Sequence, residues 1–187
     1  MWFMKKLSKL ILKLAGWKAY SNVEVAPKCV FCVAPHTSNW DFWIGKLAYS
    51  SMGGVRPNFL IKKEWFRFPF NLFFGPMGGI PVNRGAKSSL TEAVIEEAKK
   101  LDRFQLAITP EGTRSANHEW KRGFYFIAKG ANIPLYIVAL DFGRKEAYIS
   151  HEYKLTDDPD ADLKAIQQWY IEHDIKGCHP EKFKTAE

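Results

Sequence analysis

The sequence has few cysteines, no long apolar run and a deficit of acidic residues. Three cysteines among 187 residues exclude a disulfide framework and are typical of a reducing compartment. No stretch approaches the roughly 20 apolar residues of a membrane-spanning helix, and lysines interrupt the first apolar run, which excludes a secretory signal. With 20 Asp and Glu against 27 Lys and Arg, the net charge of +7 indicates an anionic partner.

Motifs of metal, redox and nucleotide sites are also missing. Cys29 and Cys32 have the spacing of a zinc or thiol redox pair, but no second pair accompanies them. They lie in an apolar run that reads as a strand, where residues three apart point to opposite faces. No Gly-rich loop ending in Gly-Lys occurs. We therefore expect no metal site and no resident cofactor.

Residues 2–17 have the pattern of a basic amphipathic helix, with apolar residues at helical spacing. Five lysines and no acid lie in the first eighteen residues, and each lysine contributes roughly 1 kcal/mol on an anionic lipid surface. The helix either packs on the domain with solvated lysines or lies on a membrane. We favour the membrane, because Trp2, Phe3 and Trp17 suit an interface. The expected division is a membrane-surface helix at 1–20 and one globular domain at 21–187.

Strand-like and helix-like segments alternate through the rest of the chain. The expected strands are 28–34, 57–61, 79–82, 105–109, 133–142 and 147–153, and the expected helices are 39–51, 86–101, 120–131 and 162–173. This alternation predicts an α/β fold with a mainly parallel mixed sheet flanked by helices. The aromatic segment 64–77, broken by Pro69, fits either buried core or a membrane contact.

Polar clusters follow three of the expected strands. Pro35-His36 follows the first strand, Asn83-Arg84 follows the strand at 79–82, and residues 111–114 follow the strand at 105–109. Because the carboxyl ends of parallel strands form the binding edge of an α/β sheet, we expect these clusters to share one rim.

His36 and Asp41 suit a general base and the carboxylate that orients it. The alternative for Asp41 is structural, because Ser38-x-x-Asp41 is also a helix-capping pattern. In the later cluster, Gly112 allows a tight turn, and Arg114 suits a phosphate. The alternative there is an ordinary surface turn containing an Arg–Glu pair.

In order and approximate spacing, these clusters resemble the motifs of the lysophosphatidate and glycerophosphate acyltransferase family. The four family motifs are His-x4-Asp, a strand ending in Arg, Pro-Glu-Gly-Thr-Arg-Ser, and an apolar strand with proline, matched by His36 with Asp41, 79–84, 110–115 and 133–138. The chain departs from the family at Pro35, which replaces the usual Asn, and at Ile137, which replaces a second proline. A third departure is the missing aromatic of the second motif. These differences affect the expected identity of the acceptor more than the expected reaction, because the His36–Asp41 pair is intact.

The resemblance implies an O-acyltransferase that needs no cofactor. In that family, the residue matching His36 deprotonates the acceptor hydroxyl and the one matching Asp41 orients it. The hydroxyl attacks the thioester of acyl-CoA or acyl-carrier protein without a covalent acyl-enzyme. The residues implied to hold the acceptor and its phosphate are Arg84, Glu111, Gly112, Thr113 and Arg114. The implied acceptor is a lysophospholipid, 1-acyl-glycerol-3-phosphate, and the product is phosphatidate.

Other functions fit parts of the pattern. The same chemistry suits another lysolipid, such as an aminoacyl lysolipid, and a non-catalytic lipid-binding membrane protein would share the N-terminal helix. Nucleic acid is suggested only by the charge, and it is disfavoured because the basic residues are dispersed. We expect a peripheral, monotopic protein on the cytoplasmic face of the cell membrane.

Overall fold

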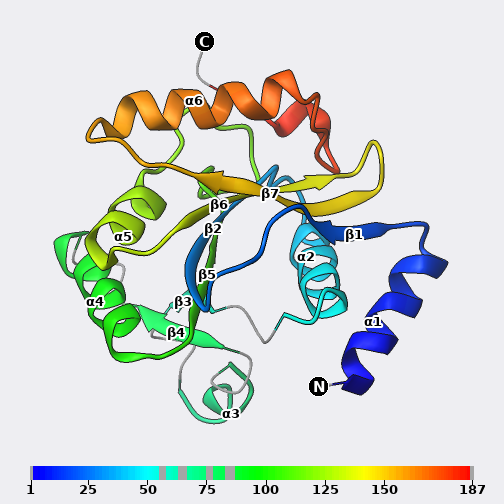
Figure 1. Ribbon diagram of the computed structural model, residues 1–187, viewed down its shortest axis with the longest axis horizontal. Helices are drawn as coiled ribbons and strands as arrows, with labels where there is room; N and C mark the ends of the chain where they lie inside the picture. The colour runs from blue at the N-terminus through cyan, green and yellow to red at the C-terminus, as the bar shows by residue number, and fades with distance from the viewer. Residues whose placement is uncertain (1, 55–57, 63–66, 75–77, 83–86, 186–187) are drawn as a thin grey trace.

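The computed structural model describes residues 2–54, 58–62, 67–74, 78–82 and 87–185 (Figure 1). The helices are α1 (Trp2–Leu14), α2 (Trp40–Ser51), α3 (Asn71–Phe74), α4 (Lys87–Lys100), α5 (Gly123–Ala131) and α6 (Pro159–Glu172), with a 3-10 turn at Pro180–Lys182. The strands are β1 (Lys18–Ser21), β2 (Lys28–Ala34), β3 (Phe59–Lys62), β4 (Gly79–Val82), β5 (Phe104–Ile108), β6 (Leu135–Asp141) and β7 (Glu146–Tyr153).

A five-stranded sheet in the order β1-β7-β6-β2-β5 forms the centre of the molecule. The pairs β1–β7, β6–β2 and β2–β5 are parallel, and only the β6–β7 hairpin is antiparallel. The predicted α/β class, with a mainly parallel mixed sheet flanked by helices, is therefore confirmed. The central strand β2 is buried along most of its length, which explains its near-continuous apolar sequence.

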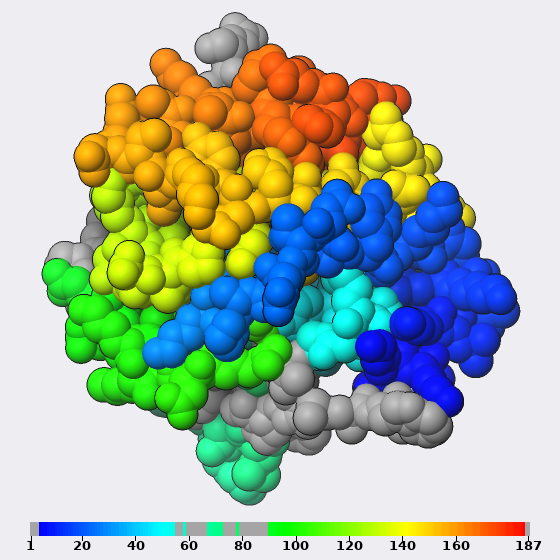
Figure 2. Space-filling model, in the orientation of Figure 1, coloured from blue at the N-terminus to red at the C-terminus, as the bar shows by residue number. Residues whose placement is uncertain are grey.

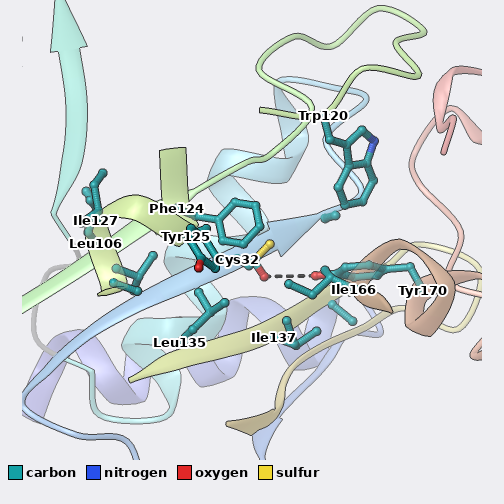
Figure 3. Packing of buried hydrophobic residues seen from close by; sticks show 14 of the residues in the cluster. Cys32, Leu106, Trp120, Phe124, Tyr125, Ile127, Leu135, Ile137, Ile166 and Tyr170 are labelled. Atoms are coloured by element: carbon teal, nitrogen blue, oxygen red, sulfur yellow. Dashed lines mark hydrogen bonds between the residues drawn. The ribbon is translucent and has the colours of Figure 1, made fainter. Parts of the chain in front are cut away.

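Helices α4, α5 and α6 cover one face of the sheet (Figure 1). Val30, Cys32 and Ala34 of β2 point into this layer. Tyr170 of α6 is fully buried there. Its hydroxyl donates to the main-chain oxygen of Cys32 (Figure 3) or to that of Val138, each at 3.0 Å. The pairing satisfies a polar group that is costly to bury alone, and it ties α6 to the strand that leads into His36.

Helix α2 covers the opposite face of the sheet, and α1 packs against α2. Leu12 of α1 joins a buried cluster with Ile44 and Ala48 of α2. Cys29 points to this face, whereas Cys32 lies in the other layer, as expected for residues three apart on a strand. Both cysteines are buried and free, and desolvation raises the pKa of each thiol, to about 12 for Cys29.

The structure differs from the sequence expectations in several places. Residues 18–21 form β1, an edge strand paired with β7, where the sequence analysis expected no strand. The predicted division at residue 20 therefore falls inside a strand of the main sheet. Strands β3 and β4 form a separate two-stranded sheet, so the polar cluster after β4 does not follow a strand of the central sheet. The short runs of 57–61 and 79–82 could not reveal this, since sequence periodicity carries no sheet order.

No helix within the described ranges is long and apolar enough to cross a membrane. Among the same residues, no three His, Cys, Asp or Glu side chains group as candidate metal ligands.

Candidate active site

The site forms where β2 and β5 end side by side. Cys32 of β2 is in register with Ile108 of β5, so the segments after the two strands leave the sheet together. The first segment leads into α2, and the second forms a long loop before α5. Parallel pairing of two adjacent strands therefore brings His36 next to Glu111, although they are 75 positions apart.

The side chains of His36 and Asp41 are in hydrogen-bond contact. The imidazole Nδ1 lies 3.1 Å from Asp41 Oδ2. Because an ionised carboxylate only accepts hydrogen bonds, the contact favours the neutral tautomer that carries its proton on Nδ1 and leaves Nε2 as an acceptor. The His36 side chain is 23% exposed and that of Asp41 is 2% exposed. The arrangement suits a proton acceptor that faces a substrate while its orienting carboxylate stays in the protein.

Asp41 also fixes the main chain before α2. The same Oδ2 accepts the amide hydrogens of Thr37 at 2.7 Å and Ser38 at 2.8 Å, and Ser38 Oγ accepts from the amide of Trp40. The capping interpretation and the orienting interpretation therefore describe one carboxylate that makes both kinds of contact. Its other oxygen, Oδ1, is buried and has no hydrogen-bond partner within the described part of the chain.

Glu111 lies inside the protein, 4% exposed. Its Oε1 accepts the main-chain N–H of His36 at 2.7 Å. Its Oε2 is buried without a hydrogen-bond partner among the residues described. Desolvation raises the pKa of Glu111 to about 7, against the lowering effect of its hydrogen bonds with main-chain amides and of His36. A carboxyl of this kind exchanges its proton near neutral pH.

Gly112 makes the tight turn after β5. Its amide donates to Thr109 O at 3.1 Å, and its φ of +66° lies in the left-handed region. Asn117 closes the loop, because its Nδ2 donates to the carbonyls of Glu111 and Glu119, each at 2.9 Å. These hydrogen bonds hold the loop in one shape and fix the position of the Glu111 main chain, from which its side chain extends.

The other predicted acceptor residues lie at the surface or outside the described ranges. Arg114 is exposed, and its Nη1 contacts the side-chain oxygen of Asn39, directly before α2. Thr113 Oγ1 accepts from the amide of Ser115 at 3.2 Å. The site thus brings Arg114 to the same end of α2 as His36 and Asp41. Arg84 lies outside the described residues.

The C-terminal segment contributes contacts that the sequence did not reveal. The amide of His179 donates to Thr37 Oγ1 at 3.1 Å, and Thr37 is almost fully buried. Gly177 packs so closely that a Cβ there would lie 2.8 Å from the same oxygen. The sequence after 173 reads as a polar tail, and a lone glycine is too weak a signal to predict this packing.

Comparison with known proteins shows the family to which the chain belongs. A protein-family model described as Acyltransferase matches residues 19–141, and no curated protein matches the sequence significantly. Among solved structures, the chain is similar to the 1-acyl-sn-glycerophosphate (LPA) acyltransferase PlsC from Thermotoga maritima. The identity is 16% and the TM-score 0.60, over 94% of this chain and 80% of that chain. At this identity the likeness shows a shared fold. Because the family match runs from β1 through β6 and includes the whole His36–Glu111 site, the chain belongs to the acyltransferase family and is an acyltransferase.

Proposed function

We propose that the protein moves a fatty acyl group from a thioester to a hydroxyl of a lysophospholipid, with His36 as the general base. The observation that carries this proposal is the contact between His36 Nδ1 and Asp41 Oδ2, which leaves Nε2 as an acceptor on a partly exposed ring. A positioned base of this kind typically contributes about 10²- to 10⁴-fold to the rate.

The proposed reaction has two linked steps. The acceptor hydroxyl gives its proton to Nε2 of His36 while its oxygen bonds to the thioester carbonyl carbon. The C–S bond then breaks, and the leaving thiolate receives the proton from Nε2, which regenerates the base. Asp41 stabilises the imidazolium that exists between the steps. The products are a diacyl phospholipid and the free thiol of CoA or of the acyl-carrier protein, without an acyl-enzyme or a resident cofactor.

The proposed acceptor is lysophosphatidate, which would give phosphatidate. Arg114 supports it, because an exposed guanidinium beside the start of α2 suits a phosphate monoester. The PlsC structure that shares this fold is described as an LPA acyltransferase. Arg84, Gly112 and Thr113 are proposed to complete the phosphate site.

The acceptor is proposed to reach the site from a membrane surface. Apolar side chains on the outer face of α1 are exposed, at Met4, Leu7, Leu10, Ile11 and Leu14. On the neighbouring α2, Trp40 and Trp43 are exposed as well. Figure 2 shows α1 at the outer edge of the molecule, beside α2. Together with the lysines of α1, this surface supports peripheral binding to anionic lipid on the cytoplasmic face.

An acyl-transfer assay with purified protein tests the substrates. Acyl-CoA and acyl-carrier protein are supplied separately with a panel of lysolipids, and the products are identified by mass spectrometry. The proposal expects phosphatidate from lysophosphatidate with at least one donor. Transfer only to another lysolipid, such as an aminoacyl lysolipid, would reject the acceptor. No transfer with any pair would favour a non-catalytic lipid-binding protein.

Flotation with vesicles containing phosphatidylglycerol tests the membrane surface. Replacing Leu10 and Leu14 together with Gln removes exposed apolar area from α1 without touching the buried Leu12. The double variant is expected to stay in the unbound fraction while the parent floats. Ile171→Gln on α6, which also alters an exposed apolar residue, is the matched control and is expected to float. Equal flotation of all three proteins would reject this surface.

A further inference from the structure

Glu111 occupies a place that does not suit direct contact with a substrate. By resemblance its carboxylate is expected to hold the acceptor, yet it is 4% exposed. Its side-chain oxygen Oε1 accepts a hydrogen bond from the main-chain N–H of His36 at 2.7 Å. The short contact is formed within the protein, between the loop after β5 and the segment before α2.

This contact completes an anchoring of the segment that carries the base. Glu111 holds the amide of His36, and Asp41 holds the amides of Thr37 and Ser38. Three consecutive main-chain amides therefore donate hydrogen bonds to two buried carboxylates. Because the imidazole direction depends on the main chain beneath it, loss of one anchor displaces Nε2. A displacement of about 1 Å can lower a rate by roughly 100-fold.

We propose that Glu111 is a positioning residue that acts through the main chain of His36 rather than by binding the acceptor. The inference rests on the proposed function, since it assigns Glu111 a part in presenting the base of that reaction. It predicts a defect in turnover, where an acceptor-binding role predicts a defect in affinity.

The charges around Glu111 give the role a pH signature. The groups that face it are His36 and Asp41 from the segment before α2, Cys32 from β2 and Tyr170 from α6. Burial raises the pKa of Glu111 to about 7. Its negative charge, present above that pH, stabilises an imidazolium at His36 as the reaction proceeds. The pH profile of turnover is therefore expected to change near pH 7 when residue 111 cannot ionise.

Two substitutions separate positioning from acceptor binding. Glu111→Gln keeps an oxygen that accepts the His36 amide, and Glu111→Ala removes it. We expect Glu111→Ala to lower kcat about 30-fold or more, with KM for lysophosphatidate within about twofold, and Glu111→Gln to restore most of the loss. The Gln variant should also show the altered pH profile near pH 7. Glu119→Ala, at an exposed carboxylate of the same loop, is the control and should match the parent.

A rise in KM of about tenfold in both variants, with kcat unchanged, would overturn the proposal and return Glu111 to acceptor binding. A second readout does not depend on activity. In the protein as it stands, hydrogen exchange of the His36 amide, followed by NMR, should be slow in the parent and in Glu111→Gln and clearly faster in Glu111→Ala, because only Ala lacks an oxygen that accepts this amide. If the His36 amide behaves as expected in a protein that shows no acyl transfer, the proposed function fails and the contact stands. Equally slow exchange in Glu111→Ala would reject the contact.

Discussion

At the scale of single residues, the site depends on one side chain serving two purposes. Asp41 Oδ2 accepts from the imidazole of His36 and from two main-chain amides. The sequence offered these as competing interpretations, orienter or helix cap. The geometry shows that both interpretations apply, because a carboxylate three residues after Ser38 reaches back over the segment that carries His36.

Asp41→Asn is expected to lower kcat by about 100-fold or more while the fold persists. The amide oxygen of Asn still accepts from Thr37 and Ser38, but a neutral side chain no longer stabilises the imidazolium or specifies which ring nitrogen is protonated. Steady-state kinetics with a thermal melt as the check on folding measures both effects. A kcat within threefold of the parent would mean that Asp41 is only a cap.

Gly112→Ala is expected to destabilise the protein by about 1–2 kcal/mol, because the φ of +66° disfavours any residue with a Cβ. The added Cβ would also lie 3.3 Å from Lys121 Cγ. Gly123→Ala, which meets nothing within 4 Å at the start of α5, is the matched control and should be neutral or stabilising. Urea unfolding of both variants makes the comparison, and equal stability would contradict the turn argument.

At the scale of elements, the sequence predicted the parts of the site that are carried by strong local patterns. The apolar run at 28–34 and the strand that leads into 110–115 are long enough to recognise, and their neighbourhood in a parallel sheet follows from general rules. Strand β1 was missed, since Lys18–Ser21 is mostly exposed edge strand without alternation. The contact of the C-terminal segment with Thr37 could not be predicted, because long-range packing of a loop leaves no periodic signal.

Gly177→Ala tests that missed contact. The new Cβ would lie 2.8 Å from Thr37 Oγ1, 2.9 Å from Thr37 Cγ2 and 3.2 Å from Pro35 Cβ, so the segment that bears His36 has to shift. A drop in kcat of about tenfold or more is expected. Gly45→Ala meets Leu140 at an ordinary 3.9 Å and serves as the control. If both variants turn over equally, the C-terminal segment does not position the base.

At the scale of the whole molecule, burying Glu111 makes stability depend on pH. In the folded state its pKa is about 7, against an ordinary value of 4.5. Below pH 4.5 the group is protonated in both states, and stability is then lost as pH rises toward 7, because only the unfolded chain ionises. The difference corresponds to at most ~3 kcal/mol above pH 7.

Glu111→Gln is therefore expected to gain stability over the parent between pH 4.5 and 7, and to keep that gain at pH 8. The free energy of unfolding in urea, compared for the two proteins at pH 4, 6 and 8, measures the gain. An unchanging difference across this range would show that Glu111 titrates at its ordinary value.

The assignment of His36 as the general base is best tested by the single-turnover rate of acyl transfer to lysophosphatidate for His36→Ala. We expect a rate at least about 1,000-fold below that of the parent, in a protein with an unchanged melting temperature. His173→Ala, which removes an exposed imidazole at the end of α6, should stay within twofold of the parent. A His36→Ala rate within tenfold of the parent would contradict the assignment of the base.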